Sequence, residues 1–72
     1  MKSARDEWLC GYAAALSCIV RQHDVPSIVV DALIGDGITI PQLKAARVES
    51  FDLEPIKRAV AGANDEAKRA LS

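Results

Sequence analysis

The chain has 72 residues, of which 50% are hydrophobic and 26% are charged, and its formal net charge is −1. This length allows one domain over residues 1–72, and the hydrophobic share excludes an intrinsically disordered chain. The balanced charge gives no overall attraction to nucleic acid, and because a core this small contributes little stability, we expect two copies of the chain to assemble as a homodimer.

Residues 3–22 are predicted to form the first helix. Ser3 can cap it, and Asp6 and Glu7 lie in the first turns, where the helix dipole favours negative charge. At the helical period, the large apolar side chains form one stripe, which consists of Trp8, Leu9, Tyr12, Leu16, Ile19 and Val20. Beside it runs a strip of small residues: Cys10, Gly11, Ala14, Ala15 and Cys18.

The small strip is the candidate dimer or partner interface. Small residues three and four apart let a second helix approach closely, and Gly11 inside a helix costs about 1 kcal/mol against alanine. The alternative is that the strip faces the second helix of the same chain. On one helix, Cys10 and Cys18 lie about 12 Å apart, too far for a disulfide. They are expected to be small core or interface residues of a cytoplasmic protein.

Residues 25–35 are predicted to form a second helix, with Asp24 as its cap and Pro26 in its first turn. Its apolar side chains point in every direction, so we expect the rest of the chain to cover it on nearly all sides. The alternative is a β-hairpin over residues 26–40, because β-branched residues flank Asp36 and Gly37, a strong turn pair.

The remaining helices are predicted at residues 39–47 and 52–62. Thr39 and Gln42 have the spacing of a capping box, which favours helix over hairpin here. Asp52 can cap the next helix, with Phe51 and Ile56 at the positions of a hydrophobic staple. Residues 64–71 are predicted to form a short tail helix with Asn64 as its cap, or to continue the preceding helix. The sequence therefore predicts an all-α protein, a compact bundle of about four short helices.

Residues 39–58 are also compatible with a DNA-binding helix-turn-helix motif. Its apolar residues have roughly the spacing that packs two such helices together. Against this, Arg47 stands where the turn usually has glycine, and Pro55 lies in the would-be recognition helix. The residues available to contact phosphates would be Lys44, Arg47, Lys57 and Arg58.

Catalytic, metal and cofactor sites are not expected. His23 is the single histidine, and no nucleophile motif or glycine-rich phosphate loop is present. The uncharged run at residues 9–20 is too short to span a membrane. Trp8 and Tyr12, one turn apart, suggest either an aromatic contact for a protein partner or core packing, and core packing is favoured.

Three segments resemble small helical proteins of unassigned role encoded by temperate phages: DEWL at residues 6–9, GY at 11–12 and DLEPIKR at 52–58. The resemblance implies a cytoplasmic accessory protein of an infected bacterium that binds and modulates a host protein without chemistry of its own. A structural subunit of a phage assembly remains a further alternative. The sequence therefore predicts a non-enzymatic protein-interaction module, with the helix-turn-helix regulator as the alternative.

Overall fold

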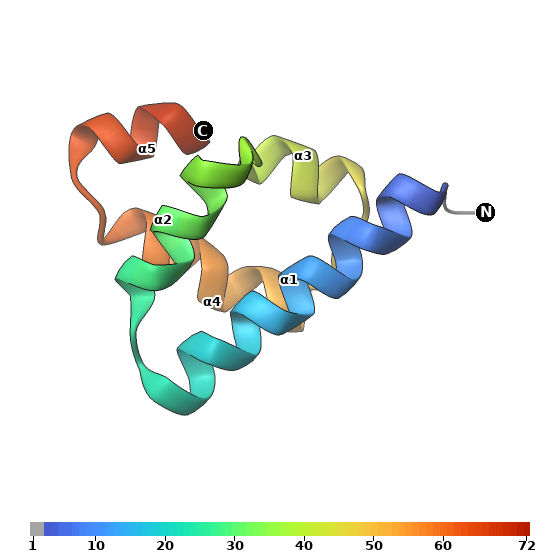
Figure 1. Cartoon of the computed structure of the whole chain (residues 1–72), viewed down its shortest axis with the longest axis horizontal. Helices are drawn as coiled ribbons and strands as arrows, with labels where there is room; N and C mark the ends of the chain where they lie inside the picture. Colours follow the sequence, from blue (N-terminus) through green and yellow to red (C-terminus); the bar gives the residue numbers. More distant parts are fainter. Residues whose placement is uncertain (1–2) are drawn as a thin grey trace.

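The computed structural model describes residues 3–72, which form five helices and contain no strand (Figure 1). The helices are α1 (Ala4–His23), α2 (Pro26–Asp36), α3 (Ile40–Ala45), α4 (Ser50–Ala61) and α5 (Asp65–Leu71). They form a compact body that measures 35 × 26 × 18 Å. The predicted all-α class is confirmed, and the tail forms a helix of its own, so the bundle has one helix more than the four expected.

Three predicted helix starts are confirmed by their capping hydrogen bonds. The Ser3 hydroxyl and the Asn64 amide oxygen each accept from the backbone N–H three residues on, at 3.1 and 2.9 Å. Thr39 and Gln42 form the full capping box, in which each side chain accepts from the backbone N–H of the other residue. Such bonds satisfy donors that the first turn of a helix leaves without partners.

The link between α1 and α2 differs from the prediction. Asp24 is the C-cap of α1 in the left-handed conformation (φ 50°, ψ 49°), and Val25 precedes α2 without a side-chain cap. Pro26 opens α2, as expected, because a first-turn residue needs no N–H partner. Residues 26–36 are helical and end at Gly37 (φ 67°), so the β-hairpin alternative is wrong.

Helix α4 begins at Ser50, two residues before the predicted start, so Asp52 lies in its first turn and Pro55 inside it. Proline has no N–H, and the carbonyl of Phe51 therefore lacks its usual helical donor. The Arg21 guanidinium of α1 supplies a donor instead, with its Nη1 3.4 Å from the Phe51 oxygen. A contact between two helices thus compensates for the proline.

The predicted hydrophobic staple between Phe51 and Ile56 is not formed. Ile56 is fully buried, whereas Phe51 is 69% exposed. The guanidinium carbon of Arg21 lies 4.1 Å from the centre of the Phe51 ring, a cation–π contact on the outer surface of α4. Because the helix starts early, Phe51 is part of its first turn and points away from the core.

Helix α4 is the centre of the bundle. It packs against α1, α2 and α5, and in Figure 1 it passes behind α1 and α2. Its inner face buries Leu53, Pro55, Ile56, Ala59 and Val60. The prediction that residues 26–34 are covered on nearly all sides is wrong, because Ile28 is 50% exposed and Ile34 45% exposed.

Adjacent positions on α2 provide a test of this packing. Leu33 is fully buried, so Leu33→Ala is expected to lower the free energy of unfolding by about 3 kcal/mol, since it removes contacts and leaves a cavity. Ile34→Ala on the same helix is the control, with an expected loss below about 1 kcal/mol, because nearly half of that side chain is exposed. Urea unfolding followed by circular dichroism measures both. Equal losses would contradict the buried position of Leu33.

Candidate functional site

Trp8 and Tyr12 form a stacked pair on the outer surface of α1. They lie four residues apart on one helix, and their ring centres are 5.1 Å apart with an angle of 23° between the planes. The Tyr12 hydroxyl donates a hydrogen bond of 2.6 Å to Asp36 Oδ2, at the last residue of α2. Asp36 therefore holds Tyr12 in place, and Tyr12 supports the indole of Trp8.

The environment of Tyr12 keeps its hydroxyl protonated. Partial burial of the ring, the hydrogen bond to Asp36 and the negative charge of Asp36 together raise the pKa of Tyr12 from 10.0 to about 12. All three causes disfavour the tyrosinate form. Tyr12 therefore remains a donor to Asp36 throughout the neutral range.

The prediction of core packing is wrong for Trp8, which is 57% exposed, while Tyr12 is half-buried. The buried residues of α1 are Leu9, Ala13, Leu16 and Ser17. This face is turned by about 60° from the centre of the predicted apolar stripe. Ser17 lies outside the predicted apolar stripe, yet it is fully buried and donates a hydrogen bond of 3.4 Å to Asp52 on α4.

The small strip lies largely outside the packed interior. Gly11 and Ala15 are exposed, and the half-buried members are Cys10, Ala14 and Cys18. A Cβ added at Gly11 would meet no atom within 4 Å. The second helix of the chain therefore does not cover Gly11, and that alternative is wrong there. Close approach by a second copy or by a partner stays a prediction.

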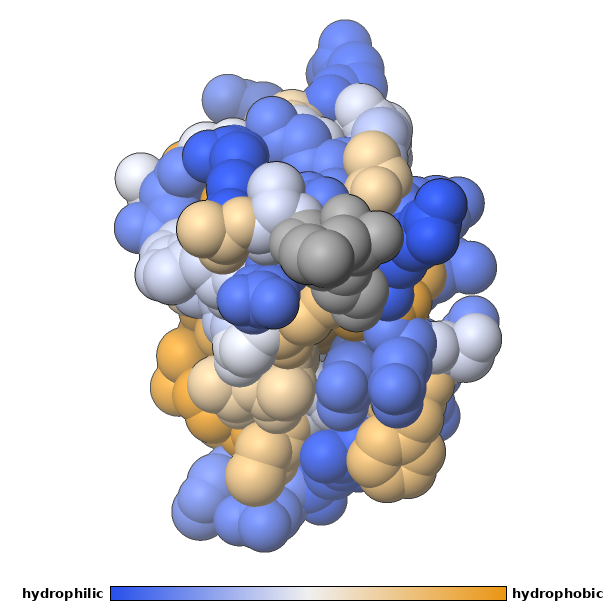
Figure 2. Space-filling model, turned by 90° about the vertical axis from the view of Figure 1, so that its right-hand side faces the viewer, coloured by the Kyte–Doolittle hydropathy of each residue, from blue (hydrophilic) through white to orange (hydrophobic). Residues whose placement is uncertain are grey.

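At the helical period, the exposed part of the strip adjoins the aromatic pair. Gly11 and Ala15 lie three and seven residues after Trp8, so the three residues share one side of α1. We call the surface made by Trp8, Gly11, Tyr12 and Ala15 the aromatic face. Arg5, three residues before Trp8 and seven before Tyr12, lies at the edge of this face. Figure 2, seen from the end at which α1 begins, shows hydrophobic side chains mostly in the lower half of this side, with hydrophilic ones around them.

The four basic residues predicted to contact nucleic acid do not share one surface. Lys44 and Lys57 line a groove between α3, α4 and α5, whereas Arg58 lines a different groove, between α2, α4 and α5. Arg47 lies in the turn between α3 and α4 with a φ of 62°, the backbone conformation that favours glycine. The structure thus brings Lys44 and Lys57 together and separates Arg58 from them.

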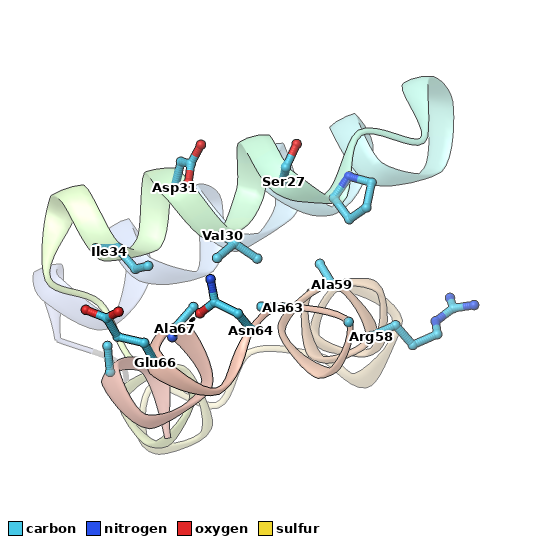
Figure 3. A pocket seen from close by; sticks show the side chains of 13 residues that line it. Ser27, Val30, Asp31, Ile34, Arg58, Ala59, Ala63, Asn64, Glu66 and Ala67 are labelled. Atoms are coloured by element: carbon cyan, nitrogen blue, oxygen red, sulfur yellow. Dashed lines mark hydrogen bonds between the residues drawn. The ribbon is translucent and has the colours of Figure 1, made fainter.

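The groove between α2 and the α4–α5 region has a volume of about 490 Å³. In Figure 3, Val30 and Ile34 approach it from α2, and Ala63, Asn64 and Ala67 lie on the opposite side. Its rim carries charges of both signs, from Asp31, Arg58 and Glu66. The sequence interpretation missed this groove. The alanines and Gly62 in its lining are only a weak indication of a groove in the sequence, because small residues usually allow helices to pack closely.

The described residues include no group of three or more metal-binding side chains close enough to share an ion. Neither cysteine forms a disulfide within residues 3–72, and Cys10 Sγ lies 3.5 Å from the carbonyl oxygen of Ala46, its acceptor at the end of α3. None of the helices within residues 3–72 is long and apolar enough to cross a membrane.

The Tyr12–Asp36 contact predicts how the tyrosine titrates. Tyr12 is the single tyrosine, so tyrosinate absorbance reports it alone, and its pKa is expected near 12. Asp36→Asn should lower this pKa, but to a value still above 10.0 because burial is the largest cause of the shift. A folded-state pKa above the ordinary value means that the associated stability is present below pH 10 and is lost as pH rises toward 12. A wild-type midpoint at 10.0 would contradict the contact.

Gly11→Leu tests whether the small strip at Gly11 is free of contacts with the rest of the chain. Because no atom of the chain lies within 4 Å of an added Cβ, the variant is expected to stay folded. Its free energy of unfolding should rise by about 1 kcal/mol, since leucine favours the helix. Thermal unfolding measures this change, and light scattering compares its assembly state with that of the wild type. A less stable monomer would mean that another part of the chain occupies this space.

Comparisons with known proteins yield no relative. No protein-family model matches the chain, and neither does any curated protein or solved structure. Function is therefore inferred from the contacts, exposure and charge of this chain's own residues.

Proposed function

We propose that the protein is a non-enzymatic interaction module that binds a folded protein partner through the aromatic face of α1. The observation that carries the proposal is the exposure of Trp8. The chain has one tryptophan, and 57% of its surface stays in solvent although the small core has few large side chains. Exposed tryptophan and tyrosine dominate the binding energy of many protein interfaces.

The aromatic face is also held in position before binding. Stacking on Tyr12 and the 2.6 Å hydrogen bond from Tyr12 to Asp36 restrict the two rings. A contact that is ordered in the free protein loses less conformational entropy when a partner binds. Gly11 and Ala15 beside the rings present no bulky side chain, so a partner can approach the backbone of α1 closely.

The partner that we propose is a host bacterial protein, as the resemblance to phage-encoded accessory proteins implies. A second copy of this chain is the other occupant that the aromatic face would suit, because small residues allow close contact between two copies of α1. The helix-turn-helix alternative has less support. Arg58 lies apart from Lys44 and Lys57, and α4 begins next to Glu49 and carries Asp52 in its first turn.

Trp8→Ala is the test of this proposal. The tagged wild-type protein is expected to retain one bacterial protein in stoichiometric amount from a nuclease-treated lysate. Titration of that purified protein should show an affinity loss of about 30-fold for Trp8→Ala, the effect expected for a central aromatic residue. The substituted side chain is largely exposed, so the helical circular dichroism signal should not change.

Phe51→Ala is the matched control, since Phe51 is an exposed aromatic residue on another helix. It should bind the partner as the wild type does. Equal losses in both variants, or none in Trp8→Ala, would overturn the assignment to the aromatic face. Retention of nucleic acid alone from untreated lysate would favour the helix-turn-helix alternative. A dimer that Trp8→Ala dissociates would identify a second copy as the occupant.

A further inference from the structure

Three lysines from three different helices surround one groove, which Arg58 does not line. Lys44 of α3, Lys57 of α4 and Lys68 of α5 line this groove, which has a volume of about 420 Å³. The lysines lie on separate helices, so the tertiary arrangement of α3, α4 and α5 brings them to one groove. We call this surface the lysine groove.

The charged side chains that line the lysine groove are all lysines. No aspartate or glutamate is among its lining residues, in contrast to the groove beside α2, which has Asp31 and Glu66 at its rim. Lys57 is 3.6 Å from Glu54 one turn earlier on α4, and its side chain is 42% exposed. Within residues 3–72, neither Lys44 nor Lys68 forms an ion pair with a carboxylate. The groove therefore has positive charge that the described chain neutralises only in part.

The surface between the lysines is apolar. Ile40 and Pro41 contribute from α3, and Val60 and Ala61 contribute from α4. This apolar floor would not help to hold an ion that binds by charge alone. Burial of an aliphatic side chain against it is favourable, because apolar surface is removed from water. The lysines and the apolar surface between them together favour a ligand that carries carboxylates beside an aliphatic group.

We propose that the lysine groove binds an acidic, leucine-rich segment of a protein partner. An aliphatic side chain of the segment covers Ile40, Pro41 and Val60, and flanking carboxylates pair with Lys44, Lys57 and Lys68. Nucleic acid fits less well, because a phosphate backbone has no aliphatic group for the floor. This inference is independent of the aromatic face, which lies on α1 and uses none of these residues.

The test uses a short fluorescein-labelled peptide in which Asp and Glu alternate with Leu, followed by fluorescence anisotropy. Saturable binding to the wild-type protein is expected. Lys57→Glu/Lys68→Glu should weaken it about tenfold or more, because two attractive contacts become repulsive. A counterpart peptide with Ser in place of each Leu should also bind about tenfold more weakly, because the apolar floor then gains no partner.

Arg58→Glu/Arg69→Glu is the matched control. It makes the same charge change on the same two helices, each time one residue further along, at positions that do not line the lysine groove. Binding should stay within about twofold of the wild type, apart from the weak effect of net charge. Circular dichroism checks the fold, and Lys57→Gln/Lys68→Gln replaces the first variant if its helical signal is lost.

Four results would overturn the proposal. The first is no saturable binding of the leucine peptide. The second is an equal loss in both double variants, and the third is equal binding of the Ser peptide; either would mean attraction by charge alone. The fourth is tighter binding of a duplex DNA of matched charge, with affinity that falls steeply as salt increases. Trp8→Ala should leave peptide binding unchanged, so failure of this proposal and failure of the aromatic face are distinguishable.

Discussion

The packing of α1 against α4 is the contact on which the rest of the structure depends. Its polar part is centred on Arg21, which donates to the Phe51 carbonyl and lies 3.7 Å from Asp52. Asp52 also accepts from the buried hydroxyl of Ser17. The contact compensates for the N–H that Pro55 lacks, and it fixes the rotation of α1 about its own axis. Without it, the Phe51 carbonyl in the first turns of α4 would depend on solvent for a donor, and the buried hydroxyl of Ser17 on α1 would lose its acceptor.

The rotation of α1 explains why the aromatic face is outside. Once Leu9, Ala13, Leu16 and Ser17 face the interior, Trp8, Gly11 and Ala15 necessarily lie on the far side of the helix. Tyr12 lies at the boundary, where its hydroxyl reaches Asp36. The proposed binding surface is thus a consequence of the same packing that forms the core.

The central position of α4 has a second consequence for function. Its inner face joins the core, and its two flanks form the walls of two grooves: one has charged side chains of both signs, and the other has lysines as its charged side chains. Arg58 lies beside acidic residues on one flank, and Lys57 lies among lysines on the other. Neighbouring basic residues on one helix therefore have different electrostatic surroundings. If the two proposed surfaces, the aromatic face and the lysine groove, bind the same partner, affinity increases when both are engaged.

The sequence by itself determined the elements whose signals are local. Ser3, the Thr39–Gln42 pair and Asn64 start their helices as predicted, because each capping bond spans three residues. The tertiary structure decided which faces are buried. Ser17 and Asp52 are 35 residues apart, and Arg21 and Phe51 are 30 apart, so no local pattern indicates that they meet. For the same reason, the sequence analysis predicted Trp8 to lie in the core and did not relate Lys68 to Lys44 and Lys57. It also predicted that α4 begins two residues later than it does. A helical period shows which residues share a face, but only the neighbouring helices determine whether that face is covered.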